Sequence, residues 1–153
     1  MDTKVTKIGS GLIDDVAKKA SDIFTYGDII PHSWIMNAFR LEAPEQGTRD
    51  QFAKFQFEIL SYTEGLKDIL LAEYKMYLKN VRGEGYIVIK PAEQTDVAMD
   101  TLRVSVQTNI RKAMSALTNI NESLLTMDQL RHRDETTGKI AALSVFSKRR
   151  LIK

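Results

Sequence analysis

The feature that most constrains the fold is a change from helical to strand-like hydrophobic spacing near residue 77. Residues 77–81 have the composition of a strand, residues 82–85 form a turn with two glycines, and residues 86–89 form a second strand that Pro91 closes. Gly83 and Gly85 can adopt positive φ without steric cost. The sequence therefore predicts one β-hairpin within a chain whose other periodic segments are helical.

Helical segments come before this hairpin. Residues 11–24 place apolar side chains at spacings of three and four, which predicts an amphipathic helix. Residues 29–30 before Pro31 predict an edge strand or an extended connection, and residues 33–39 predict a short helix. Thr48 and Gln51 have the spacing of a capping box, which predicts that a helix begins there.

A second capping-box spacing lies inside the long helical pattern that follows. Ser61 and Glu64 have this spacing and Gly65 lies beside them, so we expect a break near residues 61–63. The second helix then covers residues 63–74. Two helices joined by a tight turn form a helix-turn-helix.

After Pro91 the sequence returns to helical spacing. Residues 97–117 carry an apolar stripe, residues 119–121 form a loop, and a capping-box pair, Thr126 and Gln129, precedes a final helix over residues 127–149. The predicted fold is mainly α: a winged helix-turn-helix of three helices and a hairpin wing, followed by two C-terminal helices. The expected segments are an N-terminal amphipathic helix (1–25), a winged-helix domain (26–92) and a basic helical region (93–153).

Positive charge is concentrated in the C-terminal part. Residues 1–93 hold 12 basic and 14 acidic side chains, a net charge of −2, whereas residues 94–153 hold 10 basic and 6 acidic, a net charge of +4. Lys148, Arg149, Arg150 and Lys153 crowd the end of the chain. Phosphate contacts with nucleic acid require such side chains, although a solvated basic tail has the same composition. With no cysteine and no apolar run of about 20 residues, the expected location is cytoplasmic, without membrane association.

The stretch from Asn80 to Val88, with Val-Arg-Gly-Glu-Gly-Tyr at its centre, resembles the terminal wing of response-regulator effector domains. The resemblance implies that the helix of residues 63–74 reads the major groove and that Arg82 contacts DNA from the wing. Residues 26–91 are also similar to small proteins of tailed bacteriophages and prophages that carry this wing and a basic helical tail. That second resemblance implies no defined activity.

Two classes of function follow from these patterns. The first is a DNA-binding accessory or regulatory protein, phage-encoded, that contacts duplex DNA through the wing and basic helices. The second is a winged-helix module that binds and modulates or inhibits a host or phage protein, which the net charge of residues 1–93 favours. The stripe of residues 99–117 forms intramolecular core or the seam of a homodimer. The candidate DNA contacts are Lys67, Lys75, Lys79, Arg82, Arg103, Arg111, Lys112, Lys148, Arg149 and Arg150.

The sequence argues against an enzyme. His32 and His132 are the only histidines and lie far apart, and no Gly-rich phosphate loop, nucleophile elbow or His-Glu-x-x-His motif occurs. Acidic pairs such as Asp14-Asp15 and Asp134-Glu135 have the spacing of ordinary surface residues. No catalytic residue, metal or cofactor is therefore expected.

Overall fold

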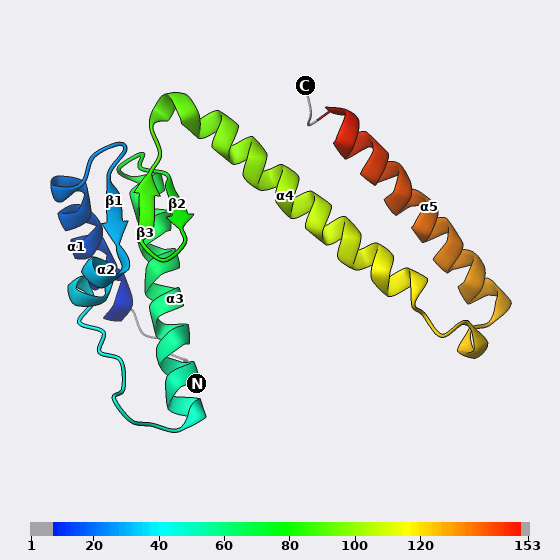
Figure 1. The fold of residues 1–153 in the computed structure, drawn as a ribbon, viewed down its shortest axis with the longest axis horizontal. Coiled ribbons are helices and arrows are strands. Elements are labelled where there is room, and N and C mark those ends of the chain that lie inside the picture. Colours follow the sequence, from blue (N-terminus) through cyan, green and yellow to red (C-terminus); the bar gives the residue numbers. More distant parts are fainter. Residues whose placement is uncertain (1–7, 151–153) are drawn as a thin grey trace, which may run out of the picture. The chain divides into compact units, whose positions relative to one another are not determined.

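A computed structural model describes residues 8–150, with side chains described for residues 11–148. The fold is mainly helical with a small three-stranded antiparallel sheet (Figure 1). The chain divides into two compact units, which we call unit 1 (Met1–Gln94) and unit 2 (Thr95–Lys153).

In unit 1, two strands form a hairpin, and four helices and strands precede it in the chain. The sheet order is β1-β3-β2, so the first strand lies against the last strand of the unit and not beside its sequence neighbour. Both pairings are antiparallel. In chain order the elements are α1 (Ile8–Ile23), β1 (Ile29–Pro31), α2 (His32–Ala38), α3 (Arg49–Ala72), β2 (Leu78–Val81) and β3 (Gly85–Val88).

The predicted hairpin is confirmed, and the short segment before Pro31 is a strand at the sheet edge. Lys79 pairs with Ile87 across the hairpin, and Ile30 pairs with Tyr86 on the other side of β3. Gly85 makes this three-stranded arrangement possible. A Cβ atom at Gly85 would lie 2.0 Å from the carbonyl oxygen of Ile30, so only glycine allows β1 and β3 to approach this closely.

The core of unit 1 joins every one of its elements. Helix α1 packs on α3 and contributes Val16, Ala17 and Ala20, all of them buried. The remaining core members come from both strands of the hairpin, β1, α2 and α3. They are Ile30, Ile35, Phe39, Leu66, Leu70, Met76, Leu78 and Val88.

The expected break near residues 61–63 is wrong, because α3 is one continuous helix from Arg49 to Ala72. Thr63 is buried inside the helix rather than at a turn. Gly65 instead faces α1: a Cβ atom there would lie 2.9 Å from Cδ1 of Ile13, so a larger residue would require that side chain to move. The helix begins where the first capping box predicts, since Thr48 and Gln51 exchange both capping hydrogen bonds.

Unit 2 is formed by most of a long helix and a second helix that follows a short turn. Helix α4 covers Pro91–Thr118 and starts six residues before the predicted boundary, at a proline, which is favoured in the first turn of a helix. A 3-10 turn (η1, Glu122–Leu124) leads to α5 (Met127–Arg150). The predicted capping box at its start is confirmed: the Gln129 amide donates to Thr126 Oγ1 at 3.3 Å and the Thr126 amide donates to Gln129 Oε1 at 2.9 Å.

Candidate nucleic-acid interface

The hairpin loop, residues 82–84, presents Arg82 to solvent. Gly83 adopts a φ of 82°, and the amide of Glu84 donates to the carbonyl of Val81 at 3.1 Å, which closes a tight turn. Arg82 is exposed, and within residues 11–148 it makes no ion pair with Glu84 or with any other carboxylate. Its guanidinium is therefore available to a ligand outside the chain.

Tyr86, one residue pair from the hairpin loop, contacts both α2 and α3 through its ring. The ring of His32, the first residue of α2, meets the Tyr86 ring edge-on with 5.3 Å between centroids. The Nζ of Lys67 from α3 lies 4.6 Å from the centroid of the same ring. These contacts pack the Tyr86 ring on the helices.

Two of the predicted DNA contacts are engaged inside the unit. Lys67 is bonded to Glu64 at 2.8 Å as well as lying over Tyr86, so its charge is partly satisfied. Lys75 adopts a φ of 58° just after α3, and its Nζ donates to the carbonyl of Ala72 at 2.5 Å. Lys75 thus stabilises the C-terminal end of α3, where a positive charge is favourable. Lys79, by contrast, is exposed on β2.

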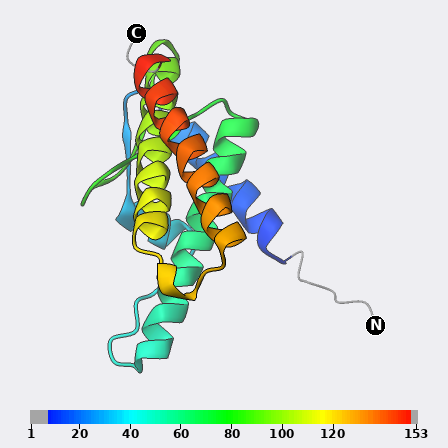
Figure 2. The ribbon, with the colours of Figure 1, turned by 90° about the vertical axis from the view of Figure 1, so that its right-hand side faces the viewer.

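The first half of α3 holds polar side chains that the sequence analysis did not assign to an interface. This half extends beyond α1, α2 and the sheet (Figures 1 and 2) and exposes Arg49 and Lys54. Asp50 and Glu58 are exposed on the same half, so it carries no excess of positive charge. The capping box at Thr48 predicts where this segment begins, but the expected break near residues 61–63 assigned the DNA-reading helix to residues 63–74.

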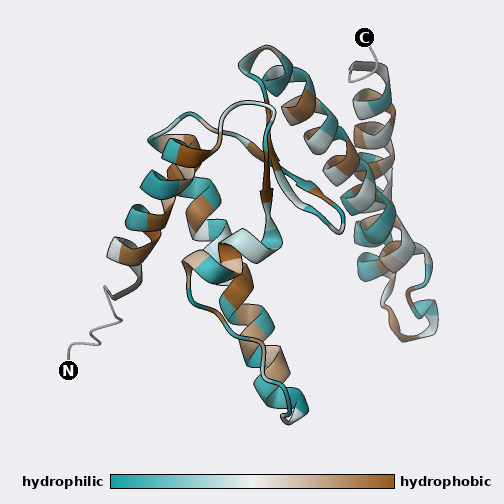
Figure 3. Ribbon diagram, turned by 60° about the vertical axis from the view of Figure 1, so that its left-hand side comes forward, coloured by the Kyte–Doolittle hydropathy of each residue, from teal (hydrophilic) through white to brown (hydrophobic). Residues whose placement is uncertain are grey.

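Apolar side chains are also exposed on this half of α3. Phe57 is 72% exposed, Leu60 57% and Phe52 40%. Figure 3 shows the hydrophobic positions along this protruding end of the helix, interleaved with hydrophilic ones. The surface is therefore mixed in character, with aromatic rings beside Arg49 and Lys54.

The predicted basic residues of unit 2 have different surroundings. Arg103 is bonded to Asp100 at 3.0 Å on its own helix. Arg111 and Lys148 come together at one groove between α4 and α5, of about 270 Å³, and Lys112 is exposed elsewhere on α4. Arg149 and Arg150 end α5, but their side chains lie outside the described residues, as does Lys153.

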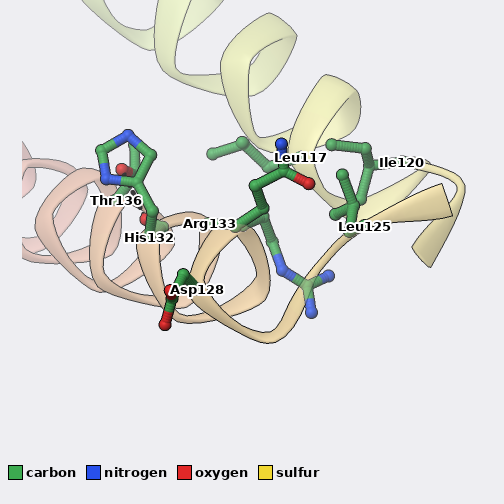
Figure 4. A pocket seen from close by; sticks show the side chains of 8 residues that line it. Leu117, Ile120, Leu125, Asp128, His132, Arg133 and Thr136 are labelled. Atoms are coloured by element: carbon green, nitrogen blue, oxygen red, sulfur yellow. Dashed lines mark hydrogen bonds between the residues drawn. The ribbon is translucent and has the colours of Figure 1, made fainter. Parts of the chain in front are cut away.

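A larger hollow lies at the turn between α4 and α5 (Figure 4). It has a volume of about 480 Å³ and apolar walls that include Leu117, Ile120 and Leu125. Arg133 lines it, but the guanidinium donates to Glu122 at 2.7 Å and its Nε lies 2.8 Å from Asp134. The hydrogen bond with Glu122 raises the pKa of Arg133 above its usual range. Because two carboxylates already engage this cation, the hollow offers no free charge for an anionic ligand.

Among the residues that the structure describes, no three His, Asp or Glu side chains gather closely enough to hold a metal ion. In the same part of the chain, no helix is both long and apolar enough to cross a lipid bilayer.

No protein-family model matches this sequence, and searches of curated proteins and of solved structures find no significant match.

Proposed function

We propose that unit 1 is a winged-helix domain that binds duplex DNA without catalysing a reaction, as an accessory or regulatory protein. The order of its elements, α1-β1-α2-α3-β2-β3, with the sheet order β1-β3-β2, is the arrangement expected for such a domain. In this proposal α2 and α3 form the helix-turn-helix, and the hairpin is the wing. The observation that carries the proposal is Arg82, which is exposed at the tip of the wing and makes no ion pair with a carboxylate among residues 11–148.

The structure changes which side chains we expect to contact DNA. Base contacts in a helix-turn-helix come from the N-terminal residues of the second helix. The reading residues would therefore come from the first half of α3, including Arg49 and Lys54, and not from residues 63–74. Lys79 and Arg82 would contact phosphates or the minor groove, whereas Lys67 and Lys75 would support the fold.

Fluorescence anisotropy with random duplex DNA, at low and at physiological salt, tests this proposal. We expect Arg82→Ala to weaken binding several-fold and to lower the slope of log K against log salt by about one, since one phosphate contact is lost. Lys18→Ala is the matched control, because it removes one exposed positive charge from α1. Absence of binding at low salt, or equal effects of the two variants, would contradict the proposal.

A second candidate function is protein binding through the first half of α3. The exposure of Phe57 and Leu60 favours it, because contiguous exposed apolar side chains mark interaction sites. A pull-down from bacterial lysate with wild type, Phe57→Ser and Arg82→Ala separates the two candidates. Protein docking requires that Phe57→Ser abolish capture of a defined partner while Arg82→Ala leaves it unchanged.

The resemblance to small phage proteins stays a prediction. A phage-encoded DNA-binding protein and a phage-encoded inhibitor of a host protein would both suit this fold. The two experiments above discriminate between these roles whatever the source of the chain.

A further inference from the structure

A cavity of about 460 Å³ lies in unit 1 where the C-terminal ends of α1 and α3 come together. Its walls are the last turn of α1, the loop that follows, and the segment that joins α3 to β2. Small-molecule sites in proteins have volumes of about 300 to 1,000 Å³, so the cavity has a suitable size. Arg49 begins α3 and the cavity lies beyond its other end, so the candidate nucleic-acid contacts are not part of it.

Aromatic side chains dominate the walls of this cavity. Phe24, Tyr26 and Tyr74 line it, and Met76 lies beside them. Phe24 and Tyr74 are half-buried, whereas Tyr26 is 43% exposed. The π-system of an aromatic ring carries negative charge on its face, and a cation above that face is attracted to it. Aromatic walls therefore favour a cation over an anion in this cavity.

One carboxylate adds to this preference. Asp22 is the only charged residue among those that line the cavity. Its carboxylate is exposed, and within residues 11–148 it makes no ion pair or hydrogen bond. The nearby Asp28 differs, because its carboxylate accepts from the amide and the hydroxyl of Thr25 at 2.8 and 3.1 Å. Asp28 is therefore used within the turn, and Asp22 is available to a ligand.

The backbone of α1 contributes negative charge as well. The helix ends at Ile23, beside the cavity, and no basic residue lies in its last turn. The unpaired carbonyl groups at a helix C-terminus together act as roughly half a negative charge. The end of α3 is different, because Nζ of Lys75 donates to the carbonyl of Ala72. The uncompensated negative charge at the cavity thus comes from the end of α1 and from Asp22.

Contacts within unit 1 hold the aromatic walls in place. The hydroxyl of Tyr26 donates to the carbonyl of Lys75 at 3.4 Å, which links the loop after α1 to the segment after α3. The ring of Phe24 meets the ring of Trp34 edge-on, with 5.2 Å between centroids. A ligand that enters pre-positioned walls loses less of its binding free energy to ordering the protein.

We propose that this cavity, which we call the aromatic pocket, binds a small alkylated ammonium ion. A quaternary ammonium has no N–H group, so aromatic rings and one carboxylate are sufficient to stabilise it. A guanidinium or primary ammonium carries several donors that each need an acceptor. The hydroxyl groups of the pocket already donate elsewhere, Ser21 to the carbonyl of Lys18 and Thr25 to Asp28. This proposal goes beyond DNA binding and does not rest on it.

Titration of the isotope-labelled full chain with choline, followed by NMR, tests the proposal. The comparison ligand is the neutral isostere of choline, in which a tert-butyl group replaces the trimethylammonium group. We expect saturable shifts of amide signals from residues 21–26 and 74–76 at millimolar choline, and binding of the isostere that is weaker by about tenfold. Sodium chloride at equal concentration controls for ionic strength. No saturable shift with choline, or equal binding of the isostere, would overturn the proposal.

Substitutions in the pocket separate the carboxylate from the rings. Asp22→Asn keeps the shape and removes the charge, so we expect choline to bind several-fold more weakly. Asp15→Asn is the matched control, because it removes another exposed carboxylate of α1 that does not line the pocket. Tyr26→Leu should also weaken binding several-fold, whereas Tyr26→Phe keeps the ring and should bind like wild type. Equal effects of the two Asp variants, or of the two Tyr26 variants, would overturn the assignment. No DNA is present, so failure here leaves the proposed function untouched.

Discussion

Unit 1 and unit 2 are both built largely from amphipathic helices, yet they bury their apolar side chains very differently. In unit 1, three helices and three strands enclose Leu66, Leu70, Ile30 and Val88 completely. In unit 2, the apolar stripe of α4 has only α5 to pack on, and no hydrophobic residue is buried among those described. A third packing element, here the sheet, is what separates a closed core from an open helix pair.

The largest effect expected from this difference appears when the units are produced separately. Residues 1–94 should unfold cooperatively in urea at a midpoint independent of concentration, because the core lies within this fragment. Residues 95–153 should lose most of their helicity when produced alone, since no hydrophobic side chain is buried in the described part of α4 or α5. Circular dichroism over a dilution series measures both.

A fragment 95–153 that is fully helical at every concentration would contradict this difference between the units. It would mean that α4 and α5 are stable as a pair without any partner. A fragment 1–94 that fails to unfold cooperatively would also contradict it, because it would show that unit 1 does not hold a complete core.

A methyl group at Gly85 should have the next largest effect, confined to unit 1. Gly85→Ala places a Cβ atom 2.0 Å from the Ile30 carbonyl oxygen, so β1 must separate from β3 or the hairpin must shift. We expect a loss of about 4 kcal/mol or more in the free energy of unfolding, in the range that marks backbone strain and lost core packing. Urea denaturation of the full chain, monitored by near-UV circular dichroism, measures it.

Gly83→Ala is the control for this variant. A Cβ atom at Gly83 meets no neighbour, so its only cost is the positive φ of 82°, about 1 to 2 kcal/mol. Similar losses in the two variants would show that the close approach of β1 to β3 is not what Gly85 provides.

A matched pair of leucines sharpens the comparison at the level of single side chains. Leu66 is completely buried in unit 1, and Leu66→Ala should cost about 3 kcal/mol of its unfolding free energy through lost contacts and a cavity. Leu102 lies in unit 2 and is half exposed, so Leu102→Ala should leave the unfolding of unit 1 unchanged. Urea titrations of the full chain measure both effects, and a shift of the unit 1 transition by Leu102→Ala would contradict the assignment.

Most of the secondary structure could be predicted because its signals are local. The hairpin, α1, α4, α5 and two of the capping boxes depend on residues close in sequence, and the structure confirms them. The break near Ser61 could not be judged from the same signals. Whether Gly65 ends a helix or faces another helix depends on Ile13, which is 52 positions away and meets it only in the folded chain.

The candidate interface was predictable only as a set of charges. Composition identifies Lys67, Lys75 and Arg82 equally well, but only the fold distinguishes them. Lys67 lies on Tyr86 and Lys75 binds the end of α3, whereas Arg82 has neither kind of contact. The sequence also could not show that the apolar stripe of α4 stays partly exposed, because such a stripe has the same pattern whether it is covered within one chain or by another molecule.

The contacts of His32 and Lys67 with the ring of Tyr86 have a mechanical consequence. They join the hairpin, one residue pair from its loop, to α2 and α3, so the hairpin tip is held relative to the first half of α3. A ligand that touches both would meet a pre-organised surface and would lose little conformational entropy at the hairpin. The protein would then prefer targets whose two contact points are as far apart as the hairpin tip and the first half of α3.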